Sequence, residues 1–257
     1  MSKRKKFIIS AGVLSGAFLV VLLTNFLFRY EAIILITIAS FLICAWALRD
    51  TLSKNLTLLT LILPVMFTAG VGFFYFLIPP TTVLARIPVV LIYALGMYAL
   101  LLTANIYNVA AIRTIALLRA AHAVGFLLTL ATSFFVFDTI WSLHLASWFN
   151  GPIIGLLSFP LVLQSLWSIE LSERISKLTM QLTVVISLVV GEVSFMLSFW
   201  PVSVAVASLF LTSILYTTIG LSQAKIAGRL FSRTVREYLL VGVIVFIAAY
   251  LSSRWGG

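Results

Sequence analysis

The chain has 257 residues, of which 62% are hydrophobic and only 9% are charged, and its formal net charge is +10. Soluble domains contain about 25% charged residues, so this composition excludes a water-soluble fold. A transmembrane helix needs about 20 mainly apolar residues, so the length accommodates eight or nine spans and no soluble domain. The basic residues form short clusters between apolar runs, which indicates membrane orientation and argues against nucleic-acid binding.

The first predicted element is the apolar run of residues 7–28, which follows four basic residues and resembles a signal peptide. This run is 22 residues long and lacks a small-residue cleavage site, so we expect an uncleaved first span. Gly12 and Gly16 form a GxxxG pattern, which predicts a helix-packing face. The partner of that face is either another span of the chain or a second copy.

The remaining apolar runs complete a single transmembrane domain of nine predicted spans. Their predicted positions are near 7–28, 32–48, 56–78, 87–104, 120–140, 152–169, 178–199, 201–222 and 238–253. Such long continuous runs predict helices, not the alternating strands of a barrel, so the fold class is an all-α polytopic helix bundle. If the last run lay on the membrane surface, the bundle would have eight spans.

The distribution of lysine and arginine predicts a cytoplasmic N-terminus, because basic residues concentrate on the cytoplasmic side. With nine spans, the inner segments hold Lys3, Arg4, Lys5, Lys6, Arg49, Lys54, Arg113, Arg119, Arg174, Lys177, Lys225, Arg229, Arg233 and Arg236. The outer segments hold only Arg29, Arg86 and Arg254. This asymmetry indicates a cell membrane with a positive-inside bias, which we expect to be a bacterial inner membrane.

Residues 105–125 place several polar side chains between the fourth and fifth spans. We expect a turn at residues 105–108 and a helix from about Val109 into the fifth span. If the helix were continuous, Asn105, Asn108, Arg119 and His122 would share a sector of about 100°. Of these residues, Asn108, Arg119 and His122 are candidate contacts for an anionic headgroup or substrate. The alternative is ordinary positive-inside anchoring with a hydrogen-bonded histidine.

Glu192 is an acidic residue well inside the seventh predicted span, about 10 Å below its outer end. A carboxylate at this depth protonates, pairs with a cation or faces a wet cavity, so Glu192 is a candidate proton or ion site. Gln181 lies on nearly the same helical face and belongs to this candidate site. The alternative is a protonated carboxyl group that is hydrogen-bonded to a neighbouring helix. A stripe of small residues on the opposite face predicts close helix packing: Thr183, Ser187, Gly191, Ser194 and Ser198.

The segment before the last span carries four basic residues at spacings of 4, 4 and 3, namely Lys225, Arg229, Arg233 and Arg236. On one helix these cations lie within about 80°, which predicts a basic surface helix that attracts anionic lipids. The alternative is that these basic residues only reflect the enrichment of lysine and arginine on the cytoplasmic side.

The sequence contains no motif for a cofactor, a metal or a catalytic centre. It has no P-loop, dinucleotide fingerprint, HExxH or CxxC motif, so we expect neither cofactor nor metal. The only cysteine, Cys44, lies in an apolar run and is expected to be a buried thiol. Asp138, Ser142 and His144 lack the strained nucleophile turn of a hydrolase, so no catalytic residue is assigned.

The pattern of spans and loops, and the segment NIYNVAAIRTIALLRAAHAVGFLLTL in particular, resembles uncharacterised bacterial multi-pass membrane proteins of a family of unknown function. The resemblance implies no activity. The position of Glu192 favours a small transporter or permease-like protein. The short loops leave open a membrane scaffold or assembly subunit, with a second copy or another membrane protein as partner. A membrane enzyme that acts on a lipid-linked substrate through Arg119 and His122 also stays open.

Overall fold

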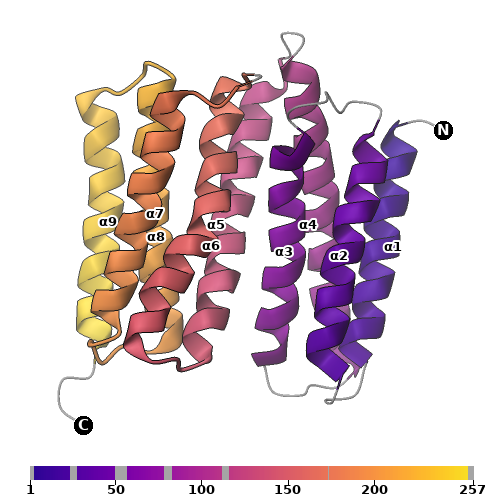
Figure 1. The fold of residues 1–257 in the computed structure, drawn as a ribbon, viewed down its shortest axis with the longest axis horizontal. Coiled ribbons are helices and arrows are strands. Elements are labelled where there is room, and N and C mark those ends of the chain that lie inside the picture. The colour runs from indigo at the N-terminus through magenta and orange to yellow at the C-terminus, as the bar shows by residue number, and fades with distance from the viewer. Residues whose placement is uncertain are drawn as a thin grey trace. The chain divides into compact units, whose positions relative to one another are not determined.

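The computed structural model describes residues 3–23, 28–49, 57–77, 83–111, 116–172 and 174–253. Within these ranges the chain forms nine α-helices and no strand (Figure 1). The helices are α1 (Lys3–Leu23), α2 (Arg29–Leu48), α3 (Thr57–Leu77), α4 (Val83–Ala110), α5 (Leu118–Ser142), α6 (Ser147–Glu170), α7 (Lys177–Leu197), α8 (Val204–Ile226) and α9 (Ser232–Ser252). All nine are long and apolar enough to cross a membrane. The predicted all-α class is therefore confirmed for the described residues, with nine helices long and apolar enough to span a membrane, and the last predicted run is one of these helices.

The prediction of a turn at residues 105–108 is wrong. Helix α4 continues through these residues to Ala110, and α5 begins at Leu118. Asparagine disfavours a helix only weakly, so packing decides where the helix ends. Here Tyr107 is buried and its hydroxyl donates a hydrogen bond to the carbonyl oxygen of Ala121 at 2.9 Å, which joins α4 to the start of α5.

The chain divides into two compact units, residues 1–132 and residues 133–257. In the first unit, α1 packs against α2 and α4, and α3 packs against α2 and α4. Its core contains three stacked aromatic rings, with Tyr93 between Phe18 at 4.5 Å and Phe67 at 5.8 Å. The Tyr93 hydroxyl also lies 3.0 Å from the Thr68 hydroxyl. Cys44 is buried in this unit, as predicted, with its thiol 3.9 Å from the Met97 sulfur.

In the second unit, the most extensive packing between helices is that of α6 against α7. Helix α8 packs against α6, α7 and α9. The Gln223 side chain joins α8 to α6, because its amide nitrogen donates to the backbone oxygen of Ser165 at 3.0 Å. Helix α9 is peripheral, since only 6% of its apolar window is buried.

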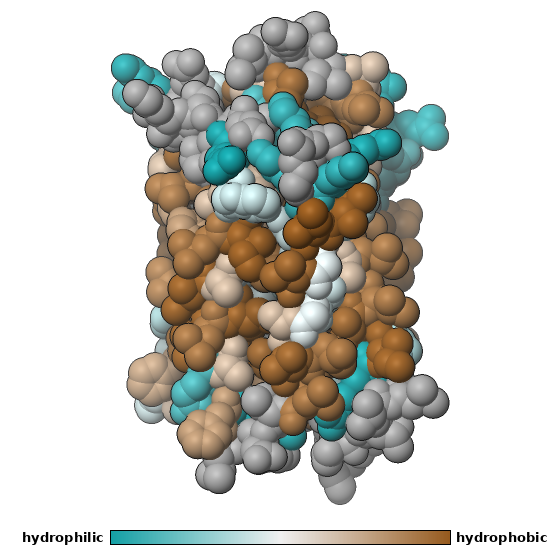
Figure 2. Space-filling view, turned by 90° about the vertical axis from the view of Figure 1, so that its right-hand side faces the viewer, coloured by the Kyte–Doolittle hydropathy of each residue, from teal (hydrophilic) through white to brown (hydrophobic). Residues whose placement is uncertain are grey.

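Large hydrophobic side chains remain exposed along the helices. On the face that Figure 2 shows, hydrophobic residues form a belt between hydrophilic ends. Exposed side chains of α2 illustrate this, with Leu35 66% and Leu42 61% exposed. Such a belt would be unfavourable in water and is typical of a surface that contacts acyl chains. The architecture is that of a multi-helix membrane protein.

Candidate ligand groove between α6 and α7

Glycines allow α6 and α7 to approach closely. A Cβ atom on Gly191 of α7 would lie 2.9 Å from the carbonyl oxygen of Gly151 and 3.3 Å from the Cα of Gly155, both on α6. The stripe of small residues predicted on α7 is buried at Thr183, Ser187, Gly191 and Ser194. At the end of this contact, the Asn150 amide donates to the Ser198 hydroxyl at 3.2 Å. The predicted packing role of this stripe is therefore confirmed.

The GxxxG pattern at Gly12 and Gly16 does not form such a contact in the described part of the chain. A Cβ on either glycine would meet nothing within 4 Å. Of the two partners that the sequence leaves open for this motif, the described residues show no packing of these glycines against another span of the same chain. A second GxxxG pattern, Gly151–Gly155, is the one that packs, and sequence reasoning missed it.

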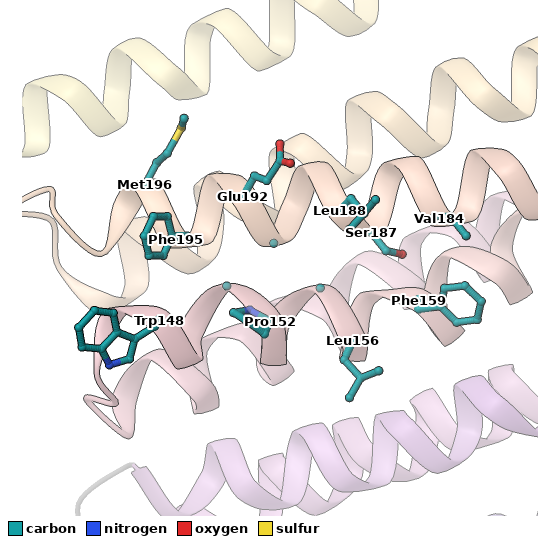
Figure 3. Close-up of a pocket in the computed structure, with 13 residues that line it drawn as sticks. Trp148, Pro152, Leu156, Phe159, Val184, Ser187, Leu188, Glu192, Phe195 and Met196 are labelled. Atoms are coloured by element: carbon teal, nitrogen blue, oxygen red, sulfur yellow. The ribbon is translucent and has the colours of Figure 1, made fainter.

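A groove of about 760 Å³ runs along the α6–α7 contact (Figure 3). The α6 side of the groove is formed by Trp148, Pro152, Leu156 and Phe159. The α7 side is formed by Val184, Leu188, Glu192, Phe195 and Met196. Gly151, Gly155 and Gly191 line it where the helices meet. Because these glycines lack side chains, the close contact leaves an open, almost entirely apolar groove of the size that small ligands occupy.

Glu192 is the one ionisable residue in the groove lining. It lies on the α7 rim, with its carboxylate pointing away from α6 (Figure 3). Helix α7 ends at Leu197, five residues later, so Glu192 lies about 7.5 Å inside the helix end. The side chain is exposed and forms neither a hydrogen bond nor an ion pair with any residue within the described ranges. Glu192 is therefore a carboxylate inside a span, and no described residue neutralises its charge.

Gln181 is not part of this groove. It is exposed on α7, eleven residues before Glu192, which corresponds to about 16 Å along the helix. The structure thus does not bring these two candidate residues together.

The polar residues near α5 lie in the first unit and form a separate group. The His122 ring lies 5.7 Å from the Tyr107 ring, whereas Arg119 is exposed. Asn108, near the end of α4, is 7% exposed, and its amide nitrogen has no hydrogen-bond partner among the described residues. The predicted helix from about Val109 into the fifth span is wrong, because α4 ends at Ala110 and α5 begins at Leu118. Asn108 therefore does not share a helix with Arg119 and His122. Arg113 lies outside the described residues.

The four basic residues near α9 do not form one helical stripe, contrary to the prediction. Lys225 lies in the last turn of α8, Arg229 lies between the two helices, and Arg233 and Arg236 lie in the first turns of α9. The interruption is caused by Gly228, whose φ of +66° is left-handed and ends α8. The Arg229 amide donates to the Ala224 carbonyl at 2.8 Å, which completes this helix cap.

All four basic side chains nevertheless remain exposed at the same α8–α9 turn. Arg233 forms an ion pair with Glu237 at 3.0 Å. We call Lys225, Arg229, Arg233 and Arg236 the basic turn.

Asp138 is a second carboxylate within a span, and sequence reasoning did not select it as a site. It is only 8% exposed on α5 and is hydrogen-bonded to Ser208 of α8. It lies two residues before the end of the fifth predicted span, 120–140. Unlike Glu192, Asp138 has a polar partner, so we interpret its hydrogen bond as an internal contact between helices of the second unit. No group of three or more His, Cys, Asp or Glu residues that would hold a metal is found in the described ranges.

Comparison with known proteins identifies a family. A family model described as "Protein of unknown function (DUF5656)" matches residues 11–252. The match covers all or part of every helix, which agrees with the resemblance inferred from residues 105–130. No curated protein and no solved structure matches the chain.

Proposed function

The chain belongs to the DUF5656 family, whose function is unknown, and we propose that it is a small membrane transporter or permease-like protein. The observation that carries this proposal is the exposed carboxylate of Glu192 beside an apolar groove, about 7.5 Å inside the end of α7. In this proposal Glu192 binds and releases the transported proton or cation.

The proposal follows from the cost of placing a charge in hydrocarbon. A charged acidic side chain at the centre of a membrane helix costs about 2.5–3.5 kcal/mol on insertion scales. Glu192 is nearer the helix end, and nothing in the described protein offsets its charge. A proton or a cation from outside the protein neutralises it, and repeated binding and release of such an ion within a span is a step of transport.

Replacing Glu192 with glutamine is expected to abolish proton flux while leaving the fold intact, because glutamine keeps the size of the side chain and removes its ionisable group. Flux is measured in liposomes that contain the purified protein and a trapped pH-sensitive dye, with a potassium gradient and valinomycin as the driving force. The wild-type protein is expected to acidify the lumen faster than protein-free liposomes, and Glu192→Gln is expected to match the protein-free rate.

Glu237→Gln is the matched control, because it removes an exposed carboxylate outside the groove. We expect it to retain wild-type flux. Absence of flux in the wild-type protein, or equal flux in Glu192→Gln and wild type, would refute a proton-carrying role of Glu192.

We also propose that the protein lies in a bacterial inner membrane with a cytoplasmic N-terminus, and that the basic turn binds anionic lipid there. The orientation is supported by the basic segments of the sequence, and the antiparallel pairing of α1 with α2 agrees with it. Lys6 at the start of α1 lies 5.9 Å from the ring of Trp46 at the end of α2, so these two basic ends lie together. Exposed basic side chains next to a span attract anionic headgroups at about 1 kcal/mol each.

Removing three positive charges from the basic turn is expected to weaken phosphatidylglycerol retention by about 100-fold. The variant that does so is Lys225→Gln, Arg229→Gln, Arg236→Gln. Native mass spectrometry of protein released from phosphatidylglycerol or phosphatidylcholine nanodiscs measures the retained lipid. The matched variant Lys3→Gln, Arg4→Gln, Lys5→Gln removes three exposed charges from α1. Equal loss of lipid from both variants would show that the basic turn has no special role.

A further inference from the structure

We propose that the α6–α7 groove binds an amphiphilic organic monocation, with an apolar body in the groove and a positive charge against Glu192. This inference rests on the proposed transport function and names the substrate class of the same site. A lipophilic ammonium or phosphonium ion represents this class.

The positive charge of the ligand is inferred from the lack of a cationic side chain beside Glu192 among the described residues. On α7 the nearest cation is Lys177, fifteen residues before Glu192, or about 22 Å along the helix. The basic turn lies at the opposite end of α8 from the end that adjoins α7. His144 lies in the turn before α6, where its ring nitrogen is 2.8 Å from the Ser142 carbonyl. None of the described residues supplies a countercharge for Glu192, and in this proposal the bound molecule supplies it.

The apolar body of the ligand follows from the groove lining. Apart from Glu192, the only hydrogen-bonding side-chain groups in the groove lining are the hydroxyl of Ser187 and the indole N–H of Trp148, so the groove offers few hydrogen bonds to a polar body. Trp148, 72% exposed, lies on the α6 side of the groove, and Phe195, 40% exposed, lies on the α7 side three residues after Glu192. Aromatic faces attract cations, so the same rings favour an apolar body and a positive head.

The same features disfavour other ligand classes. An anionic amphiphile would be repelled by Glu192, and a neutral one would leave the carboxylate uncompensated in hydrocarbon. A second copy of the chain is a poor occupant, because two arginines near helix ends of the described chain are already engaged: Arg86 donates to the Leu22 carbonyl oxygen at 2.7 Å, and Arg29 lies 4.9 Å from the Phe76 ring. The volume of about 760 Å³ suits a compact ligand and lies within the usual range of ligand pockets.

The test compares two ions of the same shape and opposite charge, tetraphenylphosphonium and tetraphenylborate. Equilibrium dialysis against protein-containing nanodiscs, with empty nanodiscs subtracted, measures saturable binding of each. We expect saturable binding of tetraphenylphosphonium and none of tetraphenylborate. We expect Glu192→Gln to weaken tetraphenylphosphonium binding at least tenfold, and Glu237→Gln to change it less than twofold.

A second pair of variants tests the groove itself. Leu156→Trp enlarges a groove residue that is 74% exposed, and Leu251→Trp makes the same change at a residue of α9 that is 76% exposed. We expect the first to weaken binding at least tenfold and the second to leave it within twofold of wild type. The proposal is overturned by equal binding of the two ions, by absence of saturable binding, or by unchanged binding in both Glu192→Gln and Leu156→Trp. It is also overturned if native mass spectrometry shows a dimer that Leu156→Trp dissociates, because the groove is then occupied by protein.

The proton-flux assay on the same preparations separates this inference from the proposed function. Flux that depends on Glu192, without tetraphenylphosphonium binding, would refute the substrate class and leave transport standing. Binding that depends on Glu192, without proton flux, would refute the proton-carrying role of Glu192 and leave the cation site standing.

Discussion

Replacing Gly191 with leucine is expected to prevent stable packing of α6 against α7 and to lower the melting temperature more than any other change proposed here. The reason is steric, since even the first side-chain carbon would lie 2.9 Å from the Gly151 carbonyl oxygen, and backbone atoms cannot rotate away. Gly191→Ala tests the same contact in a milder form and is expected to cost about 1–3 kcal/mol, as overpacking in a core does. Melting is followed by gel filtration after stepwise heating in detergent, which measures the fraction that remains monodisperse.

Gly12→Ala is the matched control for Gly191→Ala, because it adds the same methyl group to a helical glycine whose Cβ would meet nothing within 4 Å. Alanine is also the better helix former by about 1 kcal/mol, so we expect an unchanged or higher melting temperature. If Gly12→Ala destabilises the protein as much as Gly191→Ala, the α6–α7 contact is not the reason that glycine is needed.

Replacing Tyr93 with alanine is expected to destabilise the first unit by about 3–5 kcal/mol, the usual cost of removing a buried aromatic side chain. The change removes the middle ring of the stack between Phe18 and Phe67 and leaves a cavity at a fully buried position. Tyr93→Phe keeps the ring and loses only the hydroxyl contact with Thr68, so we expect a cost of about 1 kcal/mol. The same heating assay measures both.

Ile92→Ala provides the control for Tyr93→Ala on the same helix, because Ile92 is 67% exposed. We expect it to change the melting temperature little. A large loss of stability in Ile92→Ala, or no difference between Tyr93→Ala and Tyr93→Phe, would contradict the role of the aromatic stack.

The spans were predictable from the sequence because the apolar character of a membrane helix is a property of consecutive residues. The turns were less predictable from the sequence, because they depend on contacts between helices. Helix α4 continues past Asn105 because Tyr107 packs against the start of α5, and no local signal reports that contact. The break between Lys225 and Arg233 did have a local signal in Gly228, since glycine readily adopts the left-handed conformation that ends a helix.

The candidate groove was predictable only in part. Glu192 and the small residues of α7 were visible in the sequence, because their chemistry is unusual for a membrane helix. The α6 side of the groove was not visible in the sequence, because the pairing of α6 with α7 brings together residues about forty positions apart. The two GxxxG patterns have the same spacing, yet only Gly151–Gly155 faces a glycine on a neighbouring helix.

Cys44 and the tryptophans provide separate natural probes of the two units. The only thiol of the chain is buried in the first unit, where a maleimide dye reaches it only after that unit opens. Four tryptophans of the described chain, Trp141, Trp148, Trp167 and Trp200, belong to the second unit, so its unfolding dominates the change in intrinsic fluorescence. Recording both signals during one thermal ramp of the unmodified protein therefore determines whether the two halves melt as one cooperative structure or in succession.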